Sequence, residues 1–190
     1  KKIYHVVHQR CACHIFNLIV KSGLKRLKPY IEVLRTAINC LSSSNHRIAL
    51  FKNYCLAKDM RPRKFCLDMD VRWNSTYLML KHLLPYRSAF TVFINTQCGY
   101  QLLNDQHWYI AKKVLEFLEL FYDSTVTLSG VYYPTSPLVL HHILEIATHL
   151  VNYENDNQLG DVVVPMKTKF LKYLKNTLVI FFCICSGPKG

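Results

Sequence analysis

Apolar side chains recur at three- and four-residue spacing after Asn104-Asp105, and this pattern restricts the fold more than any other feature of the chain. The apolar stripe consists of Trp108, Ala111, Val114, Leu115, Leu118 and Phe121. The opposite side carries the charged residues Lys112, Lys113, Glu116 and Glu119. This division predicts an amphipathic helix with one buried face. Asn104-Asp105 is a suitable cap for its first turn.

The same periodicity recurs along most of the chain. It predicts helices over residues 13–20, 29–41, 45–56, 73–95 with an interruption at Pro85, 138–153 and 166–175. One short run, residues 3–8, is rich in β-branched and aromatic residues and predicts a strand. We therefore expect a mainly α fold with one or two short strands, in a chain of 190 residues that is long enough for one compact domain.

The charge balance of the chain favours an anionic partner. Lys and Arg total 24 against 12 acidic residues, a formal net charge of +12. Nucleic acid is the first candidate for such a partner, and an anionic membrane surface is the second. Because 51% of the residues are hydrophobic, a disordered basic tail is excluded.

Cysteine usage and the apolar C-terminal run bear on compartment and membrane contact. The 8 cysteines follow no repeating framework, so we expect free thiols in a reducing compartment. The first residue is not Met, and we expect a piece of a longer protein. As a helix, residues 177–185 would reach only about half the hydrocarbon thickness of a bilayer. We expect a buried strand or an altered tail there, and no membrane partner.

A cation and an indole stand side by side at Arg72-Trp73, at the start of a predicted helix. Arg72 can hold a phosphate with its planar guanidinium, and Trp73 can stack on a base. Asn74, Ser75 and Thr76 are cap-type residues that can satisfy the free N–H groups of a helix start. We expect Trp73 to face outward, although residue type alone suits a core position equally well.

Two clusters of cations accompany this pair. The first consists of Lys21, Lys25, Arg26 and Lys28, and the second of Arg61, Arg63 and Lys64. We expect Lys25, Arg26 and the second cluster to contact phosphate together with Arg72. The alternative is that both clusters are ordinary solvated helix flanks.

Three groups of side chains suggest metal binding and have simpler interpretations. The segment 5–14 holds His5, His8, Cys11, Cys13 and His14. Zinc usually takes two pairs of ligands well separated in sequence. Since no second pair exists, we prefer packing at a strand-to-helix junction and keep zinc as the alternative. Asp68 and Asp70 precede a helix and suit its dipole. His141, His142 and His149 share one helix and suit a surface or boundary position.

Four segments resemble blocks of plant hAT-superfamily transposases and of their domesticated relatives, the RICESLEEPER-type proteins with a BED zinc finger. Residues 10–20 resemble the block RCxAHILNLIV, and residues 67–80 resemble LDxxTRWNSTYxML. Residues 118–136 resemble FLxxFYxxTxxxSGxxYPTS, and residues 166–173 resemble MxxKFxKYW. The blocks keep the family's order and spacing across most of the chain.

The resemblance implies an RNase H-like core with a large helical insertion. In the family enzyme, two aspartates and one glutamate hold divalent metal, Mg or Mn, for strand cleavage and transfer. The family places both aspartates before the Cys-x-x-His block and the glutamate far downstream, which puts all three outside this chain. Residues 1–176 then form the RNase H-fold fragment, with the strand at 3–8 and the helical insertion at 11–176. Residues 177–190 form a divergent apolar tail.

The resemblance also assigns individual positions. Cys11 and His14 match the Cys-x-x-His pair, and Asn74 and Ser75 match the family motif. Arg72 and Trp73 match the Arg-Trp pair near the cleaved DNA end, where the tryptophan is thought to stack on an extruded base. The chain departs from the family pattern at Cys13, Val71, Leu174 and residues 181–190.

These observations predict a nuclear DNA-binding fragment that is not an enzyme. We expect no catalytic residue, no metal, no cofactor and no small-molecule substrate in this chain, and a homodimer in the full-length protein. The predicted DNA contacts are Arg72, Trp73, Lys25, Arg26, Arg61, Arg63 and Lys64. The alternative function is a helical scaffold for protein interaction or dimerisation, without DNA binding. A metal nuclease is a third possibility, and we expect no nicking activity.

Overall fold

The computed structural model describes residues 12–67, 72–98, 103–129 and 136–185, and this part of the chain contains helices and no strand. The predicted strand at residues 3–8 lies outside the described residues. The α-helices are α1 (Ala12–Leu24), α2 (Lys28–Ser42), α3 (Asn45–Ala57), α4 (Trp73–Leu83), α5 (Arg87–Gln97), α6 (Asp105–Leu128), α7 (Ser136–Asn152) and α8 (Gly160–Cys185). Two short 3-10 helices, η1 (Lys25–Leu27) and η2 (Leu84–Tyr86), join α1 to α2 and α4 to α5.

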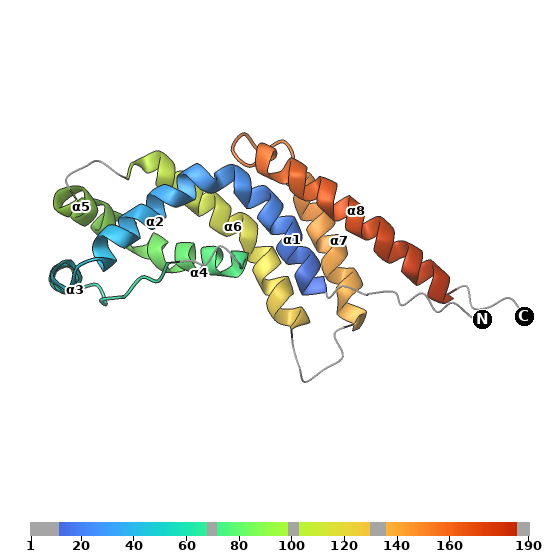
Figure 1. The fold of residues 1–190 in the computed structure, drawn as a ribbon, viewed down its shortest axis with the longest axis horizontal. Coiled ribbons are helices and arrows are strands. Elements are labelled where there is room, and N and C mark those ends of the chain that lie inside the picture. Colours follow the sequence, from blue (N-terminus) through green and yellow to red (C-terminus); the bar gives the residue numbers. More distant parts are fainter. Residues whose placement is uncertain (1–11, 68–71, 99–102, 130–135, 186–190) are drawn as a thin grey trace, which may run out of the picture.

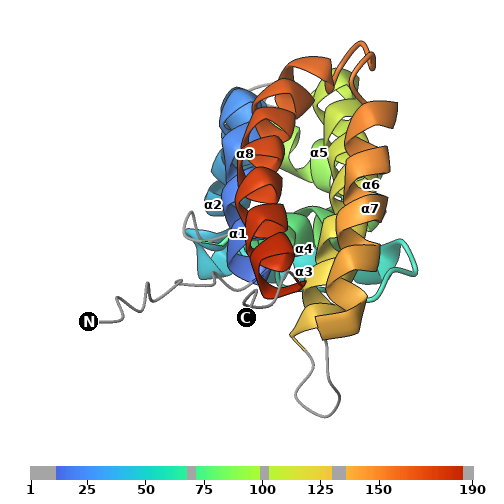
Figure 2. The same ribbon diagram turned by 90° about the vertical axis from the view of Figure 1, so that its right-hand side faces the viewer.

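Helix α6 is the central element of the fold. It packs against α1, α2, α4 and α7, and its buried residues include the whole predicted stripe except Leu115, which is half-buried. Helix α8 lies along α1 and α7, so that α1, α6, α7 and α8 form a bundle at one end of the molecule (Figures 1 and 2). Helices α2, α3 and α5 lie toward the other end, where α6 begins, and α4 packs along α6 through the ring contacts Trp73–Phe121 and Tyr77–Tyr122 (Figure 1).

Short polar side chains begin two of the helices where the sequence predicts them. The Ser44 side chain accepts a hydrogen bond from the backbone N–H of Arg47 at the start of α3. At the start of α6, Asn104 Oδ1 accepts from the N–H of His107, and the N–H of Asn104 donates to His107 Nδ1. This reciprocal pair is a capping box, which satisfies two helix-terminal donors at once. The cap predicted at Asn104 is confirmed.

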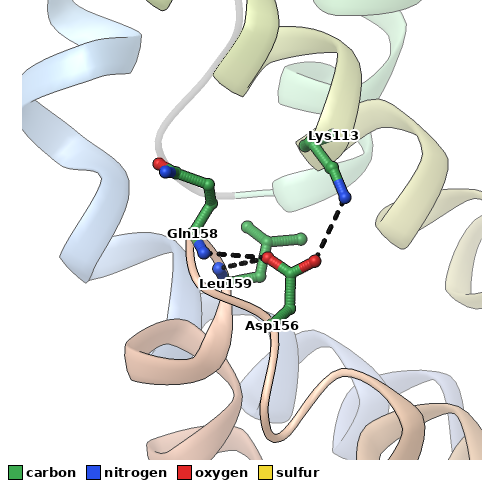
Figure 3. Close-up of polar contacts among 4 residues, drawn as sticks. All are labelled: Lys113, Asp156, Gln158 and Leu159. Atoms are coloured by element: carbon green, nitrogen blue, oxygen red, sulfur yellow. Dashed lines mark hydrogen bonds and ion pairs between the residues drawn. The ribbon is translucent and has the colours of Figure 1, made fainter.

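The last helix differs from the prediction at both ends. Helix α8 begins at Gly160 and not at Met166, and Pro165 lies within it. Asp156 allows the earlier start, because its Oδ1 accepts from the backbone N–H groups of Gln158 and Leu159 just before the helix (Figure 3). Of the two alternatives for residues 177–185, the strand is wrong, since α8 continues through them, and the divergent tail stays a prediction.

The cysteines also differ in part from the prediction. Cys40 on α2 and Cys98 at the end of α5 form a disulfide, whereas we expected free thiols throughout. Among the described residues, Cys13, Cys55 and Cys66 take part in no disulfide. Pairs so distant in sequence cannot be found from spacing, because tertiary packing of α2 against α5 brings them together.

Among the described helices, none combines the length and apolarity that a bilayer span requires.

Candidate nucleic-acid interface

Trp73 is the first residue of α4, and its ring lies inside the fold. The residue is only 3% exposed, and its ring packs edge-to-face against Phe121 of α6, with 6.4 Å between the ring centroids. The expected outward orientation of the ring is therefore wrong. Burial of a large apolar ring between α4 and α6 outweighs its display to solvent. A residue that is this buried offers little ring surface for a base to stack on, and DNA contact by Trp73 stays a prediction.

The residues next to Trp73 in the sequence match the predicted helix cap only in part. Arg72 is exposed and occupies the N-cap position in extended conformation, without a capping hydrogen bond from its side chain. Asn74 and Ser75 lie inside the first turn and are not the cap. The hydroxyl of Ser75 donates to the carbonyl of Arg72 at 2.5 Å. Arg72 thus keeps a solvent-facing guanidinium at the positive end of the α4 dipole.

A basic pocket lies beside the buried ring. It has a volume of about 220 Å³ and is formed where α1, η1 and the first half of α2 face the start of α4. Its lining residues are Lys21, Leu24, Lys25, Lys28, Ile31, Arg35, Trp73 and Thr76. Four of these eight residues are cations and none is acidic. The potentials of four neighbouring positive charges add, so the pocket has a high local positive potential that favours an anion.

Arg35 is a cation of this basic pocket that an ion pair holds in place. Its side chain is 16% exposed, and its Nη1 lies 2.6 Å from Glu32 Oε1, one turn earlier on α2. The ion pair fixes the guanidinium near the pocket wall, which lowers the conformational entropy lost when an anion binds. Lys25 and Lys28 are exposed and can move to meet a phosphate.

The structure separates the two predicted cationic clusters. Lys25 lines the basic pocket at the start of α4, whereas Arg26 is exposed and lies outside the lining. Arg61, Arg63 and Lys64 are exposed in the segment between α3 and α4, and the Tyr86 hydroxyl of η2 donates to the Arg61 carbonyl. This second cluster therefore lies at the far end of α4.

The electrostatic surroundings of His82 show that Arg63 also lies near the end of α4. The pKa of His82 is lowered by burial and by the positive charges of Arg63 and Lys81. Since His82 belongs to the last turn of α4, Arg63 lies near that end. Helix α4 is about 16 Å long at 1.5 Å per residue, so a single phosphate cannot contact both clusters. A longer polyanion that runs along α4 can contact both.

The predicted metal-ligand segment is described only in part. His5, His8 and Cys11 lie outside the described residues. His14 is exposed on α1, and the Cys13 thiol contacts the Thr125 carbonyl and the Ser129 hydroxyl near the end of α6. Within the part of the chain that the structure describes, no three His, Cys, Asp or Glu side chains are grouped to hold a metal ion. Asp68 and Asp70 also lie outside it.

The three histidines of α7 lie at the boundary with α6 or in solvent, as predicted. His141 is exposed, and His142 contacts the buried hydroxyl of Ser124 and the carboxylate of Glu145. His149 stacks on Phe117, and its Nε2 is 2.9 Å from the Phe117 carbonyl. Burial lowers the pKa of His149, and the hydrogen bond to Phe117 opposes this shift.

Arg35 is the member of the basic pocket that sequence reasoning missed. It follows Lys28 by seven residues, and Lys28 follows Lys21 by seven, which is about two helical turns in each case, with η1 lying between Lys21 and Lys28. This periodicity is the signal that predicts the pocket wall. The participation of Trp73 as a wall residue has no sequence signal, because it depends on how α4 packs against α6 and α1.

Comparisons with known proteins agree with this helical architecture. Residues 9–117 match the family model described as the ZBED1 RNase-like helical domain. The chain is 27% identical to the zinc finger BED domain-containing protein RICESLEEPER 2 of Oryza sativa subsp. japonica over 95% of the chain and 26% of that protein. It is 29% identical to a putative AC transposase of Zea mays over 94% of the chain and 23% of that protein.

The chain spans about a quarter of the length of these relatives. No solved structure matches it. The family model covers more than half of the chain, and the matched residues include the helices that surround the basic pocket. The chain is therefore a member of the ZBED1 RNase-like helical domain family, related to hAT transposases and to the transposase-derived RICESLEEPER proteins.

Proposed function

We propose that this chain is a DNA-contacting part of a transposase-derived protein and that the basic pocket beside Trp73 holds DNA phosphates. The single observation that carries this proposal is the lining of the pocket, in which four cations converge from α1, η1 and α2 and no lining residue is acidic; Glu32, which pairs with Arg35, is not in the lining. Backbone phosphates are the anions that such a surface meets along DNA. Contacts of this type position the protein and carry no sequence preference.

The exposed guanidinium of Arg72 extends this basic surface past the start of α4. In this proposal Arg72, Lys25 and Lys28 contact phosphate directly. Arg26 and the cluster Arg61, Arg63 and Lys64 contact the same strand further along. Trp73 acts as a wall that positions the cations, in place of the base-stacking role expected from the sequence. The nucleus is the compartment in which the chain would meet DNA.

The proposed role is binding without catalysis. By the family resemblance, the carboxylates that hold catalytic metal belong to parts of the longer protein outside this chain. The chain itself would then need no metal, cofactor or small-molecule substrate. Strand cleavage and dimerisation would belong to the full-length protein.

The test compares matched charge-neutral variants in DNA-binding measurements. Lys25→Gln/Lys28→Gln removes two mobile cations of the basic pocket, and Lys52→Gln/Lys58→Gln removes two exposed lysines of α3 and its C-cap. Fluorescence anisotropy with a short labelled duplex should show about 10- to 100-fold weaker binding for the pocket variant near 0.1 M salt. The α3 variant should bind within about threefold of the parent. Equal losses in the two variants would overturn the assignment to the pocket.

A second candidate function is a protein-interaction scaffold, and α7 carries the observation that favours it. Leu140, Leu144 and Val151 are more than half exposed on this helix, and its sequence contains no Lys or Arg. The burial of Trp73 also suits a scaffold. In this alternative, light scattering would show self-association that Leu140→Ser/Leu144→Ser abolishes, and the parent would have no affinity for DNA.

A further inference from the structure

A second hollow, here called the α5–α6 groove, lies away from the basic pocket. It has a volume of about 640 Å³ and lies between α5 and the first two turns of α6. Helix α5 contributes Arg87, Thr91 and Val92 to its lining, among others. Helix α6 contributes Asp105, Tyr109 and Lys112, and Trp108 forms the floor. Its size is within the range of sites that take small ligands or a few side chains.

The floor of the α5–α6 groove is rigid. Trp108 is 4% exposed, and its indole Nε1–H donates to Thr91 Oγ1 at 2.7 Å. Its ring also meets Phe90 edge-to-face at 6.3 Å between centroids. Because the indole N–H already has its acceptor and the ring is fixed from two sides, the groove does not have to be reshaped when a ligand enters.

The rim of the groove is apolar and faces water. Val92 and Tyr109, on opposite sides of the groove, are 53% and 51% exposed. An exposed valine and an exposed tyrosine across a recess provide contact area that an apolar side chain can cover. Tyrosine is also enriched at protein interfaces, where its ring gives contact area at small cost in conformational entropy.

The charges of the groove are divided between its two ends. Trp73 contacts Phe121 and Phe90 contacts Trp108, so α6 runs opposite to the path from α4 to α5. Arg87 therefore lies at the same end as Lys112, and Asp105 lies at the other end. Lys112 is also 3.8 Å from Glu116. The groove thus has one positive end but little net charge, in contrast to the basic pocket, whose lining has no acidic residue.

We propose that the α5–α6 groove docks a short peptide segment of a protein partner, in which an apolar side chain packs between Val92 and Tyr109 and an adjacent carboxylate contacts Arg87 and Lys112. The charge distribution favours a peptide over nucleic acid. A DNA strand carries a phosphate at every nucleotide, and Asp105 and Glu116 repel that charge. A peptide with one carboxylate next to apolar residues matches the positive end and the apolar rim together.

The experiment uses the whole chain and two capped peptides that differ in one group. The probe is acetyl-Leu-Leu-Asp-Leu-amide, and the control replaces Asp by Asn. Binding is followed by NMR through the indole N–H resonances of Trp73 and Trp108, which a Trp108→Phe variant assigns. The Asp peptide should shift the Trp108 resonance and leave that of Trp73 unchanged. The Asn peptide should bind about two- to fivefold more weakly, because it lacks the ionic contact.

Two variants test the lining of the groove directly. Arg87→Gln should weaken binding of the Asp peptide about two- to fivefold without changing the affinity for the Asn peptide. Tyr109→Ser should weaken both peptides, and Lys58→Gln, at an exposed site after α3, should change neither. An unchanged Trp73 resonance in each variant shows that the fold is retained.

Two outcomes would overturn the proposal. One is equal binding of the Asp and Asn peptides, or no shift of the Trp108 resonance with either. The other is a shift of the Trp108 resonance by single-stranded oligothymidine that Arg87→Gln abolishes, which would place nucleic acid in the groove. Neither outcome bears on DNA binding at the basic pocket, which is measured with the Lys25 and Lys28 variants.

Discussion

The rings of Trp73 and Phe121 meet edge-to-face, with an angle of 80° between their planes, and this contact joins the start of α4 to the centre of α6. It explains why an indole next to an exposed arginine is a structural residue in this fold. The same contact brings the N-terminus of α4 against the cationic side of α1 and α2. Packing of an apolar ring thereby places four cations around one hollow.

Trp73→Leu separates packing from base stacking. Removal of most of a buried indole should destabilise the fold by about 2–4 kcal/mol, measured by urea denaturation. The affinity of the folded variant for a single strand should stay within about twofold of the parent, because the ring is buried and leucine keeps an apolar wall at this position. If the ring stacked on a base, the loss would be about 1–3 kcal/mol of binding free energy.

Two substitutions of Asp156 distinguish the stability that comes from its backbone hydrogen bonds from the stability that comes from its ion pair with Lys113. Asp156 Oδ1 accepts two backbone hydrogen bonds, and Oδ2 lies 3.1 Å from Lys113 Nζ (Figure 3). Asparagine can keep the acceptor and loses only the charge. We expect Asp156→Ala to lower the free energy of unfolding by about 1–2 kcal/mol, and Asp156→Asn to lower it by less than half as much. Equal losses would contradict the role of the turn.

The carboxylate of Asp156 should make the free energy of unfolding sensitive to acid. The hydrogen bond from Gln158 and the contacts with Lys113 and Leu159 lower the pKa of Asp156 against the opposing effect of burial. A lowered folded-state pKa gives stability that is present above the unfolded pKa, about 3.9, and is lost as the pH falls through the folded pKa. Asp156→Asn should remove this part of the pH dependence.

The buried imidazole of His149 makes the stability of the fold depend on pH in a higher range than Asp156 does. Burial lowers its pKa, so below about pH 6.5 the unfolded chain takes up a proton that the folded chain does not. Stability should therefore fall as the pH drops from about 7.5 to about 5.5. His149→Gln keeps a donor for the Phe117 carbonyl and does not titrate. Urea denaturation at both pH values should show a smaller fall for this variant, with the remainder due to groups such as His82, whose pKa is also lowered.

Gly23→Ala tests how closely α1 approaches α8. A Cβ at this position would lie 2.5 Å from Met166 Sδ and 2.8 Å from the Val162 carbonyl oxygen. Alanine favours a helix by about 1 kcal/mol, but overpacking costs about 1–3 kcal/mol, and the backbone carbonyl cannot move aside easily. Thermal unfolding should occur at a lower temperature than in the parent. A raised melting temperature would contradict the close contact of the two helices.

The sequence predicts most of the helices because each one buries a stripe with helical period. The cap at Asn104 and the interruption at Pro85 follow from local chemistry, and the structure confirms both. The start of α8 and the Cys40–Cys98 pair depend on contacts between distant segments, which periodicity does not encode. The tail at 177–185 continues α8 although its apolar composition also suits a strand.

The candidate site is predictable in its charges and not in its geometry. Lys21, Lys25 and Lys28 form a recognisable group, and Arg35 continues their spacing. The orientation of Trp73 cannot be obtained from residue type, because a tryptophan beside an arginine suits both an interface and a core. The distance of Arg61, Arg63 and Lys64 from the basic pocket depends on the path of the segment between α3 and α4.

The most direct test of the account is the salt dependence of duplex binding. Each phosphate contact steepens the fall of affinity with salt by about one unit on logarithmic axes. We predict that Lys25→Gln/Lys28→Gln binds more weakly than the parent and has a slope shallower by about two units. The control Lys52→Gln/Lys58→Gln should keep the parental slope. A pocket variant with unchanged affinity and slope would contradict the claim that the pocket beside Trp73 holds DNA phosphates.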